Sequence, residues 1–105
     1  MNKMLELILA RVREAADPDK VILFGSRSRG DDSPESDYDL LVIKQGVKNR
    51  RALAREIYRK LAGLPVSVDI IVETPEGVEK YRHTAGFVYR EALKGIVVYE
   101  KKPEG

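Results

Sequence analysis

The sequence lacks cysteine altogether, which excludes disulfide bonds and metal sites built from thiolates. A chain without disulfides suits a reducing compartment, so we expect a cytoplasmic protein. Histidine is almost missing as well, because His83 is the only one in the chain. One histidine cannot form a histidine cluster around a metal ion, and we do not expect His83 to be catalytic.

Long apolar runs are also absent, since no stretch approaches the ~20 residues that a membrane helix needs. The first residues are partly apolar, but Glu6 and Arg11 interrupt them and no small-residue cleavage site follows, so we expect no signal peptide. The net charge of +2 is small for 105 residues, which argues against a general nucleic-acid coat protein. We expect one globular domain that spans residues 1–105 and does not bind membranes.

The chain does contain an alternation of strand-like and helix-like segments. Apolar residues with helical spacing predict helices, and short apolar runs between turn residues predict buried strands. The expected strands are residues 21–24, 38–44, 66–72 and 96–99; the expected helices are residues 3–16, 49–63, 75–81 and 85–94, with a helical turn at 26–29 and a loop at 31–34. This order predicts an α/β (α+β) fold, a small mixed sheet of three to four strands with helices packed on it. The connection between the first two strands is too short for a crossover helix, so these strands should be antiparallel.

Two aspartates, Asp37 and Asp39, stand at the start of the predicted strand 38–44. Residues two apart on a strand point to the same face, so both carboxylates should project together. Two acids at the mouth of a buried strand repel each other and lose hydration, and Mg²⁺, which prefers oxygen ligands, would compensate them. The alternative is that the two acids only cap a turn.

A third carboxylate, Asp69, stands alone in the apolar run VSVDIIV. A buried and unpaired carboxylate would cost on the order of several kcal/mol. If strands 38–44 and 66–72 are neighbours, Asp69 converges with the other two acids. Such a cluster supports two divalent ions and an in-line displacement at phosphorus. The alternative is that Asp69 forms an ion pair with an arginine.

The dipeptide Gly25-Ser26 directly follows the predicted strand 21–24. Glycine lets the backbone approach a phosphate closely, and the Ser26 hydroxyl adds a donor. Arg27 and Arg29 lie in the same turn, and we expect one of them near a triphosphate, with simple solvent exposure as the alternative. A P-loop is excluded, because two aspartates follow Gly30 where that motif has lysine and then serine or threonine.

The predicted helix 49–63 is strongly basic. Its cationic residues, with the lysine before it, are Lys48, Arg50, Arg51, Arg55, Arg59 and Lys60. A solvated helix face is the simpler interpretation, and a docking face for RNA or for an acidic partner is the alternative. This helix is the only feature of the sequence that points to RNA.

The spacing of Gly25-Ser26, ten further residues and Asp37-Tyr38-Asp39 resembles the signature of the DNA polymerase β-like nucleotidyltransferase superfamily. The segment FGSRSRG around the first turn and the small size are similar to its minimal nucleotidyltransferase (MNT) branch. The resemblance covers nearly the whole chain. It implies the polymerase β-like nucleotidyltransferase fold.

The resemblance also implies a role for each candidate residue. Gly25 and Ser26 would hold the phosphates of the nucleotide. Asp37 and Asp39 would bind both Mg²⁺ ions. Asp69 would help to bind the catalytic metal and to activate the attacking hydroxyl, although it matches by position only, because no fixed spacing defines the third acid.

Members of this size commonly act as antitoxins that neutralise a helical HEPN-domain ribonuclease, in some cases by transferring AMP to one of its tyrosines. The resemblance therefore implies ATP as donor, two Mg²⁺ ions as cofactor and a HEPN-domain toxin as partner. The chain has no additional acceptor domain, so we expect a separate acceptor protein or a homodimer that completes the site. Two alternatives stay open: a module that neutralises the toxin by contact alone, and a nucleotidyltransferase that acts on RNA or a small molecule.

Overall fold

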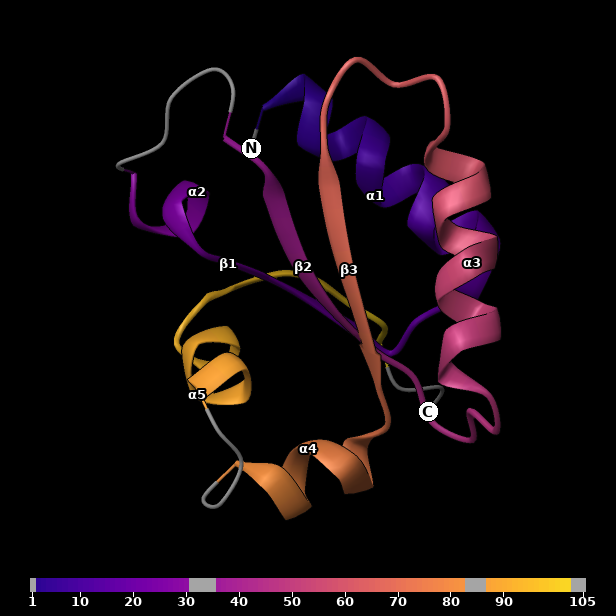
Figure 1. Ribbon diagram of the computed structural model, residues 1–105, viewed down its shortest axis with the longest axis vertical. Helices are drawn as coiled ribbons and strands as arrows, with labels where there is room; N and C mark the ends of the chain where they lie inside the picture. Colours follow the sequence, from indigo (N-terminus) through magenta and orange to yellow (C-terminus); the bar gives the residue numbers. More distant parts are fainter. Residues whose placement is uncertain (1, 31–35, 83–86, 103–105) are drawn as a thin grey trace.

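The computed structural model describes residues 2–30, 36–82 and 87–102. The predicted loop at 31–34, His83 and residues 103–105 lie outside these ranges. The described elements are α1 (Lys3–Ala16), β1 (Lys20–Phe24), α2 (Ser26–Arg29), β2 (Tyr38–Ile43), α3 (Arg50–Leu61), β3 (Val68–Glu73), α4 (Pro75–Tyr81), α5 (Phe87–Leu93) and β4 (Ile96–Glu100), as Figure 1 shows. The predicted order of helices and strands is confirmed, including the short helical turn α2.

The four strands form one mixed sheet in the order β3-β2-β1-β4. β1 pairs antiparallel with both β2 and β4, whereas β2 and β3 run parallel (Figure 1). The predicted antiparallel pairing of the first two strands is confirmed, and the strands that carry Asp39 and Asp69 are indeed neighbours. In the register, Phe24 lies opposite Asp39, and Asp39 lies beside Asp69. The end of β1 and the starts of β2 and β3 therefore meet at one end of the sheet.

Helices cover both faces of this sheet. On one face α1 packs against α3, and Ile8, Val12 and Ile57 are completely buried there. On the other face α4 and α5 cover the sheet, with Ala92 of α5 completely buried. Residues 40–43 of β2 are all buried although their side chains alternate between the two faces, which is the pattern of a central strand. Burial of each large apolar side chain stabilises the folded state by roughly 1.5–3 kcal/mol.

Polar caps fix the starts of α3 and α4. Asn49 Oδ1 accepts a hydrogen bond from the Ala52 amide at 3.0 Å, and Thr74 Oγ1 accepts one from the Gly77 amide at 3.0 Å. Pro75 occupies the first position of α4, where its missing N–H costs nothing. These side chains satisfy amides that have no partner inside the helix. The predicted start of α4 is confirmed, whereas α3 begins one residue after the predicted start, because Asn49 is its cap, and ends at Leu61, two residues before the predicted end.

β3 begins two residues later than predicted, at Val68. Its parallel partner β2 begins at Tyr38, which is paired with Val68. The paired residues of the two strands therefore begin at Tyr38 and Val68. Ser67 contributes one additional bond, because its carbonyl accepts from the Tyr38 amide at 3.0 Å. The strand runs on to Glu73, one residue beyond the predicted end.

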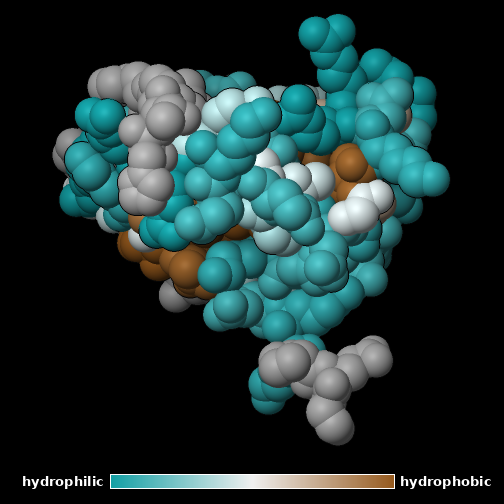
Figure 2. All heavy atoms as spheres, turned by 90° about the horizontal axis from the view of Figure 1, so that it is seen from below, coloured by the Kyte–Doolittle hydropathy of each residue, from teal (hydrophilic) through white to brown (hydrophobic). Residues whose placement is uncertain are grey.

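Figure 2 shows, from below, a mostly hydrophilic surface with a hydrophobic patch on the side where α5 lies in Figure 1. Ile96 and Val97, which follow α5 at the start of the edge strand β4, are about half exposed. None of the described helices is both long enough and apolar enough to cross a membrane.

Candidate active site

Gly25 directs the chain sharply from β1 into α2. Its φ of 76° and ψ of −160° lie in a region that only glycine adopts readily. Ser28 stabilises the turn, because its hydroxyl and its amide both donate to the Gly25 carbonyl, at 2.7 and 3.1 Å. A Cβ atom on Gly25 would overlap the carboxylate of Asp39. The backbone of the turn therefore passes directly against this carboxylate.

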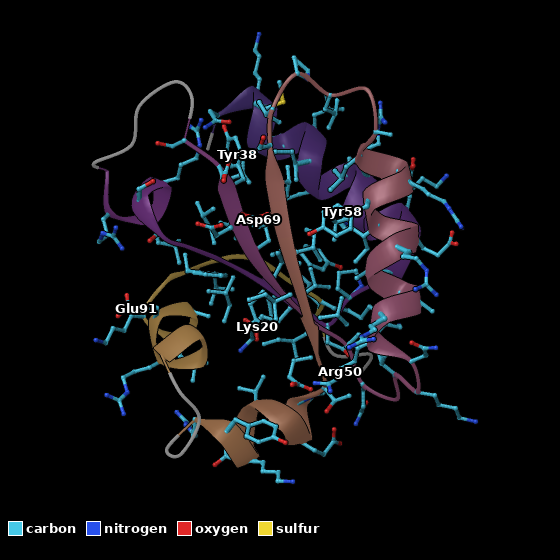
Figure 3. The ribbon with its side chains drawn as sticks, viewed as in Figure 1. Lys20, Tyr38, Arg50, Tyr58, Asp69 and Glu91 are labelled. Atoms are coloured by element: carbon cyan, nitrogen blue, oxygen red, sulfur yellow. The ribbon has the colours of Figure 1, made fainter. Side chains whose placement is uncertain are left out.

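Asp39 and Asp69 form a carboxylate pair across the parallel strands β2 and β3. They are register partners, so their side chains point to the same face of the sheet. Burial, the negative charges of Asp69 and Asp37, and a hydrogen bond with Asp69 together raise the pKa of the Asp39 carboxyl. The pair lies at the end of the sheet where the Gly25 turn begins, and Figure 3 shows Asp69 near the start of β3.

Asp37 and Asp69 are both exposed. Asp37 precedes β2 and is exposed, although its charge acts on Asp39. Asp69 is also exposed, as the second residue of β3, and its side chain points to the face of the sheet opposite to α3. The prediction that Asp69 is buried in its apolar run is therefore wrong, while its expected proximity to Asp39 is confirmed.

Arg27 has a well-defined place beside the site. Its guanidinium lies 4.0 Å from the centre of the Tyr38 ring, and its Nε donates to the Ser36 carbonyl at 2.9 Å. Tyr38 is buried, so this stacking attaches α2 to the start of β2. Arg29, in the same turn, is exposed. Of the two arginines expected near a triphosphate, Arg29 is thus the more accessible one.

The donor set of the site fits a divalent cation. Asp37, Asp39 and Asp69 offer hard carboxylate oxygens. Burial, followed by the negative charges of Asp69 and Asp37, raises the pKa of Asp39, and a bound cation would offset both effects. In the described part of the chain, however, no three acidic or histidine side chains already converge as a metal site. Asp37 is exposed, so the packing of the protein leaves its side chain free to turn toward the Asp39–Asp69 pair.

We expect Asp39→Asn to raise the thermal stability of the protein when no divalent cation is present. The folded state holds the pKa of Asp39 above its ordinary 3.8, so stability falls as the pH rises through this window and stays lower at pH 7. Removal of the charge should raise Tm at pH 7 by about 2–5 °C. In a domain of this size roughly 1 kcal/mol corresponds to about 4–8 °C, and solvent around the partly exposed Asp39 screens part of the electrostatic destabilisation.

Thermal unfolding in EDTA at pH 7 and at pH 3.5 measures this effect. The difference between the two proteins should be largest at pH 7 and should nearly vanish at pH 3.5. Added Mg²⁺ should stabilise the wild type more than Asp39→Asn, because a ligand that binds only the folded state raises its stability. A lower Tm of Asp39→Asn at pH 7 in EDTA would contradict the prediction.

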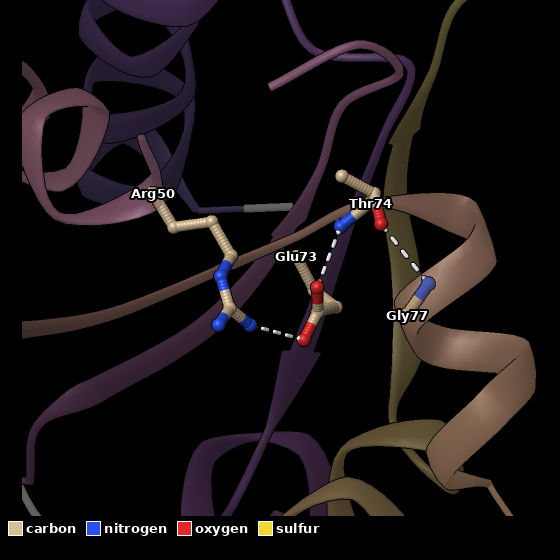
Figure 4. A network of polar contacts seen from close by, with 4 residues as sticks. All are labelled: Arg50, Glu73, Thr74 and Gly77. Atoms are coloured by element: carbon tan, nitrogen blue, oxygen red, sulfur yellow. Dashed lines mark hydrogen bonds and ion pairs between the residues drawn. The ribbon is translucent and has the colours of Figure 1, made fainter. Parts of the chain in front are cut away.

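Among the described acids, the buried one is Glu73, at the opposite end of β3, and no sequence motif indicated it. Its side chain is 3% exposed. Glu73 Oε1 accepts from Arg50 Nη1 at 2.7 Å and Oε2 accepts from the Thr74 amide at 2.9 Å, as Figure 4 shows. A Cβ atom on Gly77 would overlap this carboxylate. Glu73 therefore joins the starts of α3 and α4 to the sheet and lies away from the candidate active site.

Replacement of Arg50 by alanine should destabilise the fold by about 1–3 kcal/mol, because the buried Glu73 carboxylate would lose its ion pair with Arg50. Arg51 provides a matched control, since it is the next residue on the same helix and is exposed. Arg51→Ala should change stability by less than about 0.5 kcal/mol. Equal urea midpoints for the two variants would show that the contact with Glu73 contributes nothing.

Comparison with known proteins agrees with this geometry. A family model described as a nucleotidyltransferase domain matches residues 5–99. No curated protein matches the sequence significantly. The crystal structure of a protein from Sulfolobus solfataricus that is assigned as a nucleotidyltransferase is similar, with 29% identity, a TM-score of 0.58 and coverage of 92% of this chain and 86% of that one.

A second solved structure, a toxin–antitoxin complex with AMP-PNP, contains a chain with the same fold. It is 20% identical, with a TM-score of 0.59 and coverage of 92% of this chain and 73% of that one. The family model covers most of the sequence, including the Gly25 turn and all three aspartates. The chain belongs to the nucleotidyltransferase domain family.

Proposed function

We propose that this nucleotidyltransferase is a Mg²⁺-dependent adenylyltransferase that transfers AMP from ATP to a protein side chain. The observation that carries the proposal is the contact between the Gly25 turn and the Asp39–Asp69 carboxylate pair. A phosphate bound by the turn would lie beside the acids. No other part of the described chain combines a close backbone approach with paired carboxylates.

Each residue then has a role in one displacement reaction. Gly25 and Ser26 hold the β- and γ-phosphates, and Arg29 adds a positive charge at the edge of the turn. Asp37, Asp39 and Asp69 would hold Mg²⁺, which would supply charge neutralisation at the reacting phosphate.

The proposed reaction is a displacement at the α-phosphorus of ATP. The acceptor hydroxyl oxygen forms a bond to the α-phosphorus, and the bond from that phosphorus to the bridging oxygen breaks. Pyrophosphate leaves with the electron pair, and Asp69 accepts the hydroxyl proton.

A toxin is the proposed acceptor. The similar fold in a toxin–antitoxin complex with AMP-PNP supports both a toxin partner and an adenine nucleotide as donor. The resemblance to the MNT branch makes a HEPN-domain ribonuclease the specific candidate. A tyrosine, serine or threonine hydroxyl of that ribonuclease would receive AMP.

The test uses ATP labelled at the α-phosphate, Mg²⁺ and the product of a neighbouring HEPN-type gene. We expect label on the partner, an equivalent amount of pyrophosphate, and no transfer in EDTA. Absence of label on the partner while the wild type still binds AMP-PNP would reject a protein acceptor. Absence of nucleotide binding would reject the adenylyltransferase as such.

One observation favours a second function, neutralisation of the toxin by contact alone. The three acids do not converge as a ready metal site in the described part of the chain. An Asp37→Ala/Asp39→Ala double variant separates the two functions. Full protection of cells that express the toxin would support contact alone, whereas loss of protection with an intact complex would support the enzyme.

A further inference from the structure

A groove of about 340 Å³ runs along the outer edge of the sheet between α3 and β3. The residues that line it are Tyr58, Leu61, Ala62, Gly63, Leu64, Val66, Ser67, Val68 and Asp69. Asp69 borders this groove, and its side chain points with that of Asp39 to the face of the sheet opposite to α3. The groove and the candidate active site therefore meet at the edge of β3. Figure 3 shows Tyr58 of α3 and Asp69 of β3 in the same region, with Tyr58 directed from its helix toward β3.

β3 is an edge strand. The backbone N–H and C=O groups of successive residues point alternately toward β2 and toward the groove. The Ser67 and Glu73 carbonyls accept from the Tyr38 and Lys44 amides of the neighbouring segment, each at 3.0 Å. Because strand residues alternate, the backbone of Val68 faces the other way, toward the groove. The next outward amide, that of Ile70, donates to the Tyr58 hydroxyl at 2.8 Å. The Tyr58 hydroxyl thus occupies the backbone position at Ile70 that another strand could pair with. The backbone of Val68 faces the groove.

The chemistry of the lining favours a polypeptide over a nucleic acid. Among the described residues that line the groove, none is cationic, and Asp69 is the only charged one. A phosphate backbone in this groove would meet a negative charge without a compensating arginine or lysine. The exposed arginines of α3, such as Arg51 and Arg55, are not part of the lining. An extended peptide, in contrast, can pair with an open strand edge through its own backbone.

We propose that this groove docks an extended segment of the acceptor polypeptide along β3 and delivers a side-chain hydroxyl of that segment to Asp69. The inference rests on the proposed nucleotidyl transfer, which assigns Asp69 to the acceptor side of the reaction. Backbone pairing at Val68 sets the register of the segment. Tyr58 limits its length, because the phenol occupies the next pairing position.

Amide NMR spectra of the ¹⁵N-labelled protein test the docking directly. The probes are a ten-residue peptide of alternating valine and threonine with one central tyrosine, a ten-nucleotide single-stranded RNA, and AMP-PNP with Mg²⁺. We expect the peptide to move the signals of residues 62–70 and the RNA to leave them unchanged. No peptide-dependent change in residues 62–70, or movement of these signals by the RNA instead, would overturn the proposal.

Ala62→Trp fills the groove from an exposed position, and Ala10→Trp places the same side chain at an exposed position of α1. Ala62→Trp should weaken peptide binding and AMP transfer to the peptide roughly tenfold or more, whereas Ala10→Trp should change neither. In both variants AMP-PNP should still move the Gly25 and Ser26 signals. Failure of AMP-PNP to move them in the wild type would reject the proposed function, and equal effects of the two tryptophans on the peptide would reject the groove.

Discussion

Replacement of Asp39 by asparagine should lower the rate of AMP transfer by about 10²–10⁴-fold. Among the described acids, Asp39 is the one that lies both against the Gly25 backbone, the proposed phosphate side of the site, and beside Asp69, the proposed acceptor side. Asparagine keeps the shape of the side chain but removes the negative charge that a divalent cation requires. Single-turnover transfer of labelled AMP to the partner protein measures the loss.

Glu56→Gln provides the control for this loss of charge, because Glu56 is exposed on α3 and is ion-paired only with the neighbouring Arg59 among the described contacts. It should transfer AMP at the wild-type rate. Asp39→Asn should fold normally, so circular dichroism must be unchanged. A folded Asp39→Asn protein that keeps more than about a tenth of the wild-type rate would show that another residue carries the chemistry.

Gly25→Ala should reduce transfer by about 100-fold and destabilise the fold by roughly 1–3 kcal/mol, the range for a residue held in a sparsely populated backbone region. Two effects combine at this position. The backbone has φ 76° and ψ −160°, and a methyl group would overlap the Asp39 carboxylate. The methyl group would either push the turn away from the acids or displace Asp39 from Asp69.

Gly46→Ala separates strain from overlap. Gly46 has nearly the same φ, 79°, but a Cβ atom there would meet nothing within 4 Å. We expect Gly46→Ala to lose some stability and to keep full transfer activity per folded molecule. Urea unfolding and the transfer assay together distinguish the two glycines. The contact between the Gly25 turn and Asp39 would be irrelevant to catalysis if both variants retained the same specific activity.

Local pattern was sufficient to predict the arrangement of the candidate residues that lie within a short stretch of sequence. Gly25, Asp37 and Asp39 belong to one strand–turn–strand segment, and the short connection already required the antiparallel pairing that brings Phe24 opposite Asp39. Asp69 required the additional assumption that its strand is a neighbour of β2, which the parallel register confirms.

Burial of the acids could not be predicted in the same way. Asp69 and Glu73 both stand in an apolar run, but Glu73 is buried because Arg50 and the start of α4 contact its carboxylate, and Asp69 has no such cover. Arg50 is the clearest signal that was available for Glu73, since it begins the helix that approaches this end of the strand. The stacking of Arg27 on Tyr38 is likewise a tertiary contact that no spacing rule indicates.

The parallel pairing of β2 with β3 makes the separation of Asp39 and Asp69 independent of everything between them in the chain. Backbone hydrogen bonds set this separation, so the crossover segment with α3 can change in length or sequence without altering the distance between the two carboxylates. A shift of the pairing by one residue, in contrast, would turn Asp69 to the opposite face of the sheet. Insertions in the connection between β2 and α3 should therefore be tolerated, whereas insertions within the two strands should be inactivating.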